Sequence, residues 1–146
     1  GASHEEAVQA ARDVLPRLHL YGSLTTLKYL AMGGRIGKFP ANMANLFDIR
    51  PVMTMIDGKL GLLEKVRTHR MAMNRLVQLL EKSVKGKEIV RAGIVHVNNL
   101  EDAKLLESRL RADLPMPADI LIAEFTAGLS VHGGTGLVAA VLVTRD

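Results

Sequence analysis

Two short glycine-rich motifs near opposite ends of the chain each carry one side chain that can bind an anion. Gly33-Gly34-Arg35-Ile36-Gly37 contains a guanidinium group, and His132-Gly133-Gly134-Thr135-Gly136 contains an imidazole. Glycine permits positive φ and close approach to the main chain, and successive backbone N–H groups in such turns can form an anion-binding concavity. We therefore expect an acid or a phosphate group to bind beside these motifs. A plain helix end and a plain loop are the alternative interpretations.

Common catalytic motifs do not account for these residues. A phosphate-binding loop over residues 33–38 would need Gly in place of Met32 and Ser or Thr in place of Phe39. The His132 turn resembles the oxyanion-hole turn of esterases, but the sequence has no Gly-x-Ser-x-Gly motif that would supply the nucleophile. The sequence therefore argues against a self-sufficient hydrolase.

The remaining titratable residues predict no metal site and no cofactor. The five histidines include no pair spaced i, i+4, and there is no cysteine. His96 falls at the end of an expected buried strand, where it could contact a ligand or act as a hydrogen-bonded structural residue. Arg67, at the end of an expected hairpin, could neutralise a carboxylate or simply be solvated.

Composition favours one domain with an aliphatic interior. The chain has 146 residues, of which 48% are hydrophobic but only 3% aromatic, with seven Met and no Trp. Such an interior suits ordinary packing or an alkyl ligand. The net charge of +4 is scattered, with no run of five Lys or Arg and few aromatic rings to stack bases, so we expect no nucleic-acid partner.

The absence of cysteine, of a secretory leader and of an apolar run of transmembrane length favours a cytoplasmic, bacterial-type protein that does not span a membrane. Gly1-Ala2-Ser3 resembles a cloning scar. We therefore expect the domain itself to cover residues 4–146.

The spacing of apolar residues predicts alternating helices and strands. Helices are expected over 5–18, 25–32, 39–47, 68–84 and 100–114, and strands over 19–24, 49–56, 59–67, 88–97, 119–125 and 137–144. Ser3, Thr68 and Asn98-Asn99 are expected N-terminal caps, and Asp57-Gly58 an expected hairpin turn. The His132 motif falls in a loop. This order predicts an α/β fold, a two-layer mixed sheet packed against helices.

The motifs also occur in a recognisable order. They are Leu27-Lys28-Tyr29-Leu30, Gly33-Gly34-Arg35-Ile36, Ile49-Arg50-Pro51-Val52, Asp57-Gly58, Glu64-Lys65-Val66-Arg67-Thr68 and His132-x-Gly-x-Gly. Together they resemble the C-terminal half of the DegV family, the bacterial fatty-acid-binding proteins that serve as binding subunits of fatty acid kinase. The resemblance spans about residues 21–142.

This resemblance implies a two-domain protein that buries a long-chain fatty acid, with its carboxylate near the domain boundary. A separate fatty acid kinase would phosphorylate that carboxylate, so the chain would not be an enzyme. His132 would contact the carboxylate, Arg35 would lie at the same end of the ligand or face the kinase, and Arg67 is a weaker candidate for the positive rim.

Two departures from the family pattern matter. Gly133 and Thr135 stand where the family usually has Thr and Pro. The N-terminal domain, with its Ser and Thr residues for the head group, would be missing from this chain. Two other functions stay open: an enzyme or phosphoryl-transfer domain that uses His132, and a structural or regulatory module with a vestigial pocket.

Overall fold

The computed structural model of the protein describes residues 1–34 and 49–145. Arg35 and the predicted helix over 39–47 lie outside these ranges. The described elements are α1 (His4–Val14), a 3₁₀ turn (Leu15–Arg17), β1 (Leu18–Ser23), α2 (Lys28–Met32), β2 (Arg50–Ile56), β3 (Lys59–Val66), α3 (His69–Val84), β4 (Ile89–His96), α4 (Leu100–Asp113), β5 (Ile120–Glu124), α5 (Ala127–Gly133) and β6 (Val138–Thr144).

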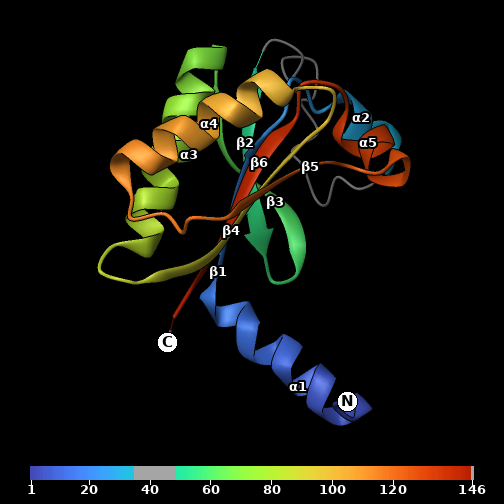
Figure 1. Ribbon diagram of the computed structural model, residues 1–146. Helices are drawn as coiled ribbons and strands as arrows, with labels where there is room; N and C mark the ends of the chain where they lie inside the picture. The colour runs from blue at the N-terminus through green and yellow to red at the C-terminus, as the bar shows by residue number, and fades with distance from the viewer. Residues whose placement is uncertain (35–48, 146) are drawn as a thin grey trace.

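The six described strands form one mixed sheet in the order β3-β2-β1-β6-β4-β5 (Figure 1). β4 and β5 run parallel and are joined through α4, whereas the other neighbouring strands are antiparallel. Helices α3 and α4 pack on one face of the sheet, and α2 and α5 lie together at one end of it. The predicted two-layer α/β fold is therefore confirmed.

Alternation along the strands separates the two faces of the sheet. Val52, Ile94 and Ala140 pack against α3 and α4, while their neighbours Met53, Val95 and Ala139 face the opposite side. The helices complete the main core with side chains that are at most 6% exposed. These are Ala72, Met73, Leu76, Val77, Leu80 and Val84 of α3 and Ala103, Leu106 and Leu110 of α4.

Several local signals in the sequence act as predicted. The Ser3 hydroxyl accepts a hydrogen bond from the Glu6 N–H, and the Thr68 hydroxyl accepts one from the Met71 N–H. Asp57 and Gly58 both have positive φ, 49° and 73°, as a two-residue hairpin turn of type I′ requires. The caps and the hairpin turn thus set element boundaries within one or two residues of those expected.

Three elements differ from the prediction. Residues 127–133, expected in a loop, form α5, and the expected helix over 25–32 is shortened to Lys28–Met32. The helix expected over 5–18 ends at Val14 and is followed by the 3₁₀ turn. The sequence of α5 has weak helix propensity because it contains two glycines and a valine, so its helical form depends on tertiary contacts with α2. Helix α1 is amphipathic as expected, yet none of its residues is buried, and it projects away from the sheet (Figure 1).

One ion pair joins the sheet to α3. Arg75 Nε donates to Glu64 Oε2 at 2.7 Å, and Arg75 Nη2 donates to the other carboxylate oxygen. These hydrogen bonds lower the pKa of Glu64 below its ordinary value of 4.5. Both side chains are about one-third exposed, so water screens the pair and limits its contribution to stability.

We expect Glu64→Gln to lower the free energy of unfolding by about 0.5–1 kcal/mol at neutral pH. Because the folded state lowers the pKa of this carboxyl group, its stabilising effect is present above the ordinary pKa and is lost as the pH falls through the folded-state value. The difference between the two proteins should therefore shrink in acid. Urea unfolding at neutral and acidic pH measures it, with Glu81→Gln on the exposed side of α3 as control. A difference that is constant with pH would contradict the prediction.

Candidate functional site

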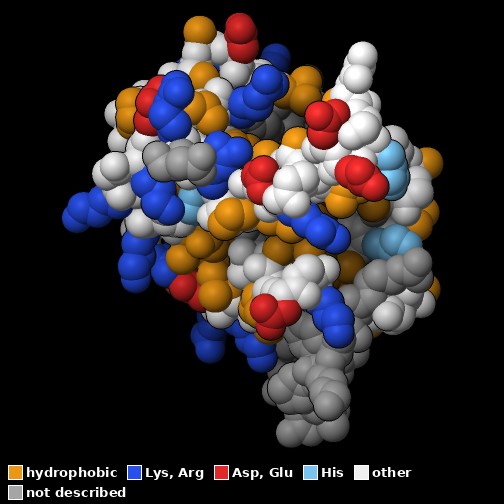
Figure 2. Space-filling view, turned by 90° about the horizontal axis from the view of Figure 1, so that it is seen from below, with side chains coloured by type: hydrophobic (Ala, Val, Ile, Leu, Met, Phe, Trp, Pro, Cys, Tyr) orange, Lys and Arg blue, Asp and Glu red, His pale blue; other side chains and the backbone are white. Residues whose placement is uncertain are grey.

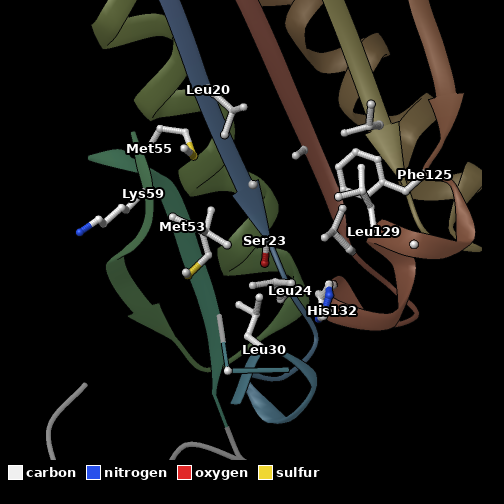
Figure 3. Close-up of a pocket in the computed structure, with 18 residues that line it drawn as sticks. Leu20, Ser23, Leu24, Leu30, Met53, Met55, Lys59, Phe125, Leu129 and His132 are labelled. Carbon is white, nitrogen blue, oxygen red and sulfur yellow. The ribbon is translucent and has the colours of Figure 1, made fainter. Parts of the chain in front are cut away.

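The face of the sheet opposite α3 and α4 holds a pocket of about 830 Å³ (Figure 3). Its walls come from β1, β2, β3, β4 and β6 and from the two short helices α2 and α5 with their flanking residues. The apolar side chains that line it are Leu20, Leu24, Leu30, Met53, Met55, Leu60, Val95, Phe125, Leu129, Leu137 and Ala139. Such a lining suits an alkyl or other apolar ligand.

The polar groups of the pocket are unevenly placed. Ser23, a buried residue at the end of β1, and His132, near the end of α5, lie toward the same end of the pocket (Figure 3). Lys59 lies on the other side of the pocket and directs its amine away from these two residues. Apart from Lys59, the pocket therefore has one polar end and apolar walls.

The Nδ1 atom of His132 is buried and has no hydrogen-bond partner among the described residues. Buried polar atoms in folded proteins nearly always have a partner, because an unpaired donor or acceptor costs about 1–3 kcal/mol. Nδ1 itself is enclosed against Gly33, whereas the His132 residue lines the pocket. A protonated ring nitrogen that faces the pocket would donate a hydrogen bond to a carboxylate oxygen.

The structure brings the two glycine-rich motifs together. A Cβ atom on Gly33 would overlap His132 Nδ1, and a Cβ atom on Gly134 would overlap the ring of Tyr29. The His132 ring therefore packs against Gly33 of the first motif, and the Tyr29 ring packs against Gly134 of the second. Gly34, with φ of 66°, follows the end of α2 and lines the pocket, as does Gly133.

The other sequence candidates lie elsewhere. Arg35 is outside the described residues, and Arg67 is exposed just after β3 and does not line the pocket. His96 is buried, and its Nδ1 accepts a hydrogen bond from the Asn99 N–H at 3.3 Å. It therefore acts as the hydrogen-bonded structural residue, the second of the two interpretations of this histidine.

Sequence reasoning missed three parts of this site. Ser23 is the polar residue that closes β1, and its position directly after Gly22 at the end of a strand was the available signal. Met53 and Met55 line the pocket because they alternate with core-facing residues of β2. Their spacing indicates a shared face, but the sequence does not say that helices leave this face uncovered.

No group of three or more His, Cys, Asp or Glu side chains in the described ranges is placed to hold a metal ion. None of the helices within those ranges is long and apolar enough to cross a membrane. The face in Figure 2 shows Lys and Arg side chains interspersed with acidic and hydrophobic ones rather than gathered into one basic surface. This view agrees with the scattered charge of the sequence.

Comparison with known proteins places these features in a family. A model of the DegV protein family matches residues 1–145. A DegV domain-containing protein of Streptomyces coelicolor is 32% identical over 145 residues, which is 99% of this chain and 51% of that protein. The chain spans about half the length of the curated relatives that it matches.

Solved structures give the same result. A fatty acid binding DegV family protein of Streptococcus agalactiae superposes with a TM-score of 0.84 and 26% identity, over 100% of this chain and 51% of that one. The Fatty Acid Kinase (Fak) B3 protein of Streptococcus pneumoniae, loaded with linoleic acid, superposes with a TM-score of 0.81 and 25% identity, over 99% of this chain and 51% of that one. On the family match and these likenesses, the chain belongs to the DegV family.

Proposed function

We propose that residues 4–146 are the C-terminal domain of a two-domain cytoplasmic protein that binds a long-chain fatty acid and presents its carboxylate to a separate fatty acid kinase. The observation that carries this proposal is the pocket itself, whose walls are largely apolar and whose polar end holds Ser23 and the His132 ring. An amphiphile with an acid head group needs both features, because a buried carboxylate without hydrogen bonds would be very costly. The fatty acid binding relatives support the same ligand class.

The surroundings of His132 favour binding over catalysis. A histidine that acts as a general base in a hydrolase is oriented by a carboxylate on its second nitrogen. No carboxylate among the described residues forms a hydrogen bond with the His132 ring, and none lines the pocket. We therefore propose that the chain is not an enzyme and that phosphate transfer belongs to the partner kinase.

The open side of the pocket supports a second domain. Met55 is 44% exposed and Leu129 is 54% exposed, although both line an apolar pocket. An exposed apolar surface of this kind usually marks a site that another group covers. We propose that the N-terminal domain expected from the family covers it and completes the ligand's enclosure. The roles of Arg35 and Arg67 near the head group or the kinase stay predictions.

Lipid extraction from the purified full-length protein tests the proposal. We expect denaturing extraction and mass spectrometry to recover about one long-chain fatty acid per protein molecule, since the pocket has the volume and the single polar end for one such ligand. The 146-residue chain by itself should retain less, because its pocket is open on one side. Recovery of nucleotides or sugar phosphates in place of lipid would contradict the proposal.

A further inference from the structure

The short helix that carries His132 has little packing of its own. α5 has seven residues, and only Gly133 among them is buried. Its position therefore depends on its contact with α2 and on the hydrogen bonds at its two ends. At the start, the Ser130 hydroxyl donates to the Phe125 carbonyl at 3.1 Å. At the end, the chain enters the turn over residues 134–137.

Hydrogen bonds hold that turn to neighbouring elements. The Gly136 N–H donates to the Val97 carbonyl at 2.9 Å, and the Asn99 amide, through Nδ2, donates to the Gly136 carbonyl at 3.1 Å. The Thr25 hydroxyl donates to the Thr135 carbonyl at 3.0 Å. The turn behind His132 is thus fixed from the residue after β4, from the N-cap of α4 and from the segment before α2.

The Asn99 side chain ties this turn to the helical layer through a network of hydrogen bonds. Its Nδ2 also donates to Asp102 Oδ2 at 2.8 Å, and His69 Nε2 lies 2.7 Å from the same oxygen. The Asp102 side chain is only 16% exposed. An ionised carboxylate only accepts hydrogen bonds, so Asp102 orients the Asn99 amide with its NH₂ group toward the carboxylate. The second hydrogen of that NH₂ group is then directed to the Gly136 carbonyl.

Asn99 immediately precedes α4 as its N-cap residue. At this position an Asn side chain usually accepts a hydrogen bond from the first turn of the helix. Here the side chain makes no such bond. Its two amide hydrogens are directed instead to Asp102 and to the turn that follows His132.

We infer that Asn99 is a positioning residue for the carboxylate end of the pocket. Through the Gly136 carbonyl it holds the end of α5 so that the His132 ring lies at the polar end of the pocket. This inference rests on the proposed function. Loss of the Asn99 amide should therefore weaken recognition of the ligand's head group and leave burial of its alkyl chain unchanged.

The test compares a long-chain fatty acid with the fatty alcohol of the same length, in the full-length protein. Asn99→Ser is the informative variant, because Ser is as good an N-cap residue as Asn but cannot reach Gly136. We expect the preference for the acid over the alcohol to fall by about fivefold, the effect of one ordinary hydrogen bond, while alcohol affinity changes by less than about twofold. Asn99→Asp, which keeps the shape and removes both donors, should lose at least as much.

Asn74→Ser is the matched control, since Asn74 accepts a hydrogen bond from Arg109 of α4 and does not line the pocket. Its acid preference should equal that of the natural sequence. An acid preference that survives in Asn99→Ser, or equal losses for acid and alcohol, would overturn the inference while leaving fatty acid binding in place. A natural protein that binds neither ligand would overturn the proposed function, and with it this inference.

Discussion

His132→Ala is expected to weaken binding of a long-chain fatty acid by roughly five- to hundredfold in the full-length protein, because the variant loses a hydrogen bond to the acid head group worth about 1–3 kcal/mol. The structure supports this size of effect. The His132 ring lines an apolar pocket and lies toward the same end of it as Ser23. A carboxylate that enters this end without the imidazole would be left with fewer donors in a poorly hydrated site.

The measurement must separate recognition from packing, because the His132 ring also lies against Gly33. A gap left by the missing ring would weaken binding of a fatty acid and a fatty alcohol alike, whereas loss of the hydrogen bond weakens the acid selectively. His19→Ala is a suitable control, since that ring lies 3.4 Å from the Thr144 hydroxyl and outside the pocket. Acid affinity within twofold of the natural protein would assign His132 to the structure of the helix end.

The parts of the fold that the sequence predicts well depend on local signals. Asp57-Gly58 identifies the β2–β3 hairpin because only a few residue types adopt positive φ at two consecutive positions. Thr68 marks the start of α3 because its hydroxyl satisfies a free N–H of the first helical turn. The strand over 88–97 is predicted by its apolar run. Helices α3 and α4 cover one face of this strand, and its other face borders the pocket.

The parts that the sequence does not predict depend on contacts between distant segments. Residues 127–133 have weak helix propensity, and α5 forms because it packs beside α2, about a hundred residues earlier in the chain. The glycine-rich motifs are separately visible in the sequence, but the contact between Gly33 and His132 is not. For the same reason Ser23 becomes a candidate site residue only when β1 is placed beside β2 and β6.

The geometry of Gly134 gives a second strong test of this contact. Gly134 ends α5 with φ of 74° and ψ of 161°, a region of backbone conformation that is essentially restricted to glycine. An added Cβ atom would also overlap the ring of Tyr29. Both the backbone and the packing therefore require glycine at this position, which lies two residues after His132.

Gly134→Ala is expected to lower the free energy of unfolding by about 2–5 kcal/mol, from backbone strain of about 1–3 kcal/mol together with overpacking against Tyr29. Gly128→Ala is the matched control in the same helix, because a Cβ atom there meets nothing within 4 Å and its backbone is helical, so it should leave stability unchanged or raise it slightly. Urea unfolding of both variants, followed by fatty acid titration of the folded fraction, decides the outcome. If Gly134→Ala is as stable as Gly128→Ala, then α5 and the turn after it do not require the close contact with Tyr29. In that case the contact between the two motifs would not be what holds His132 at the polar end of the pocket.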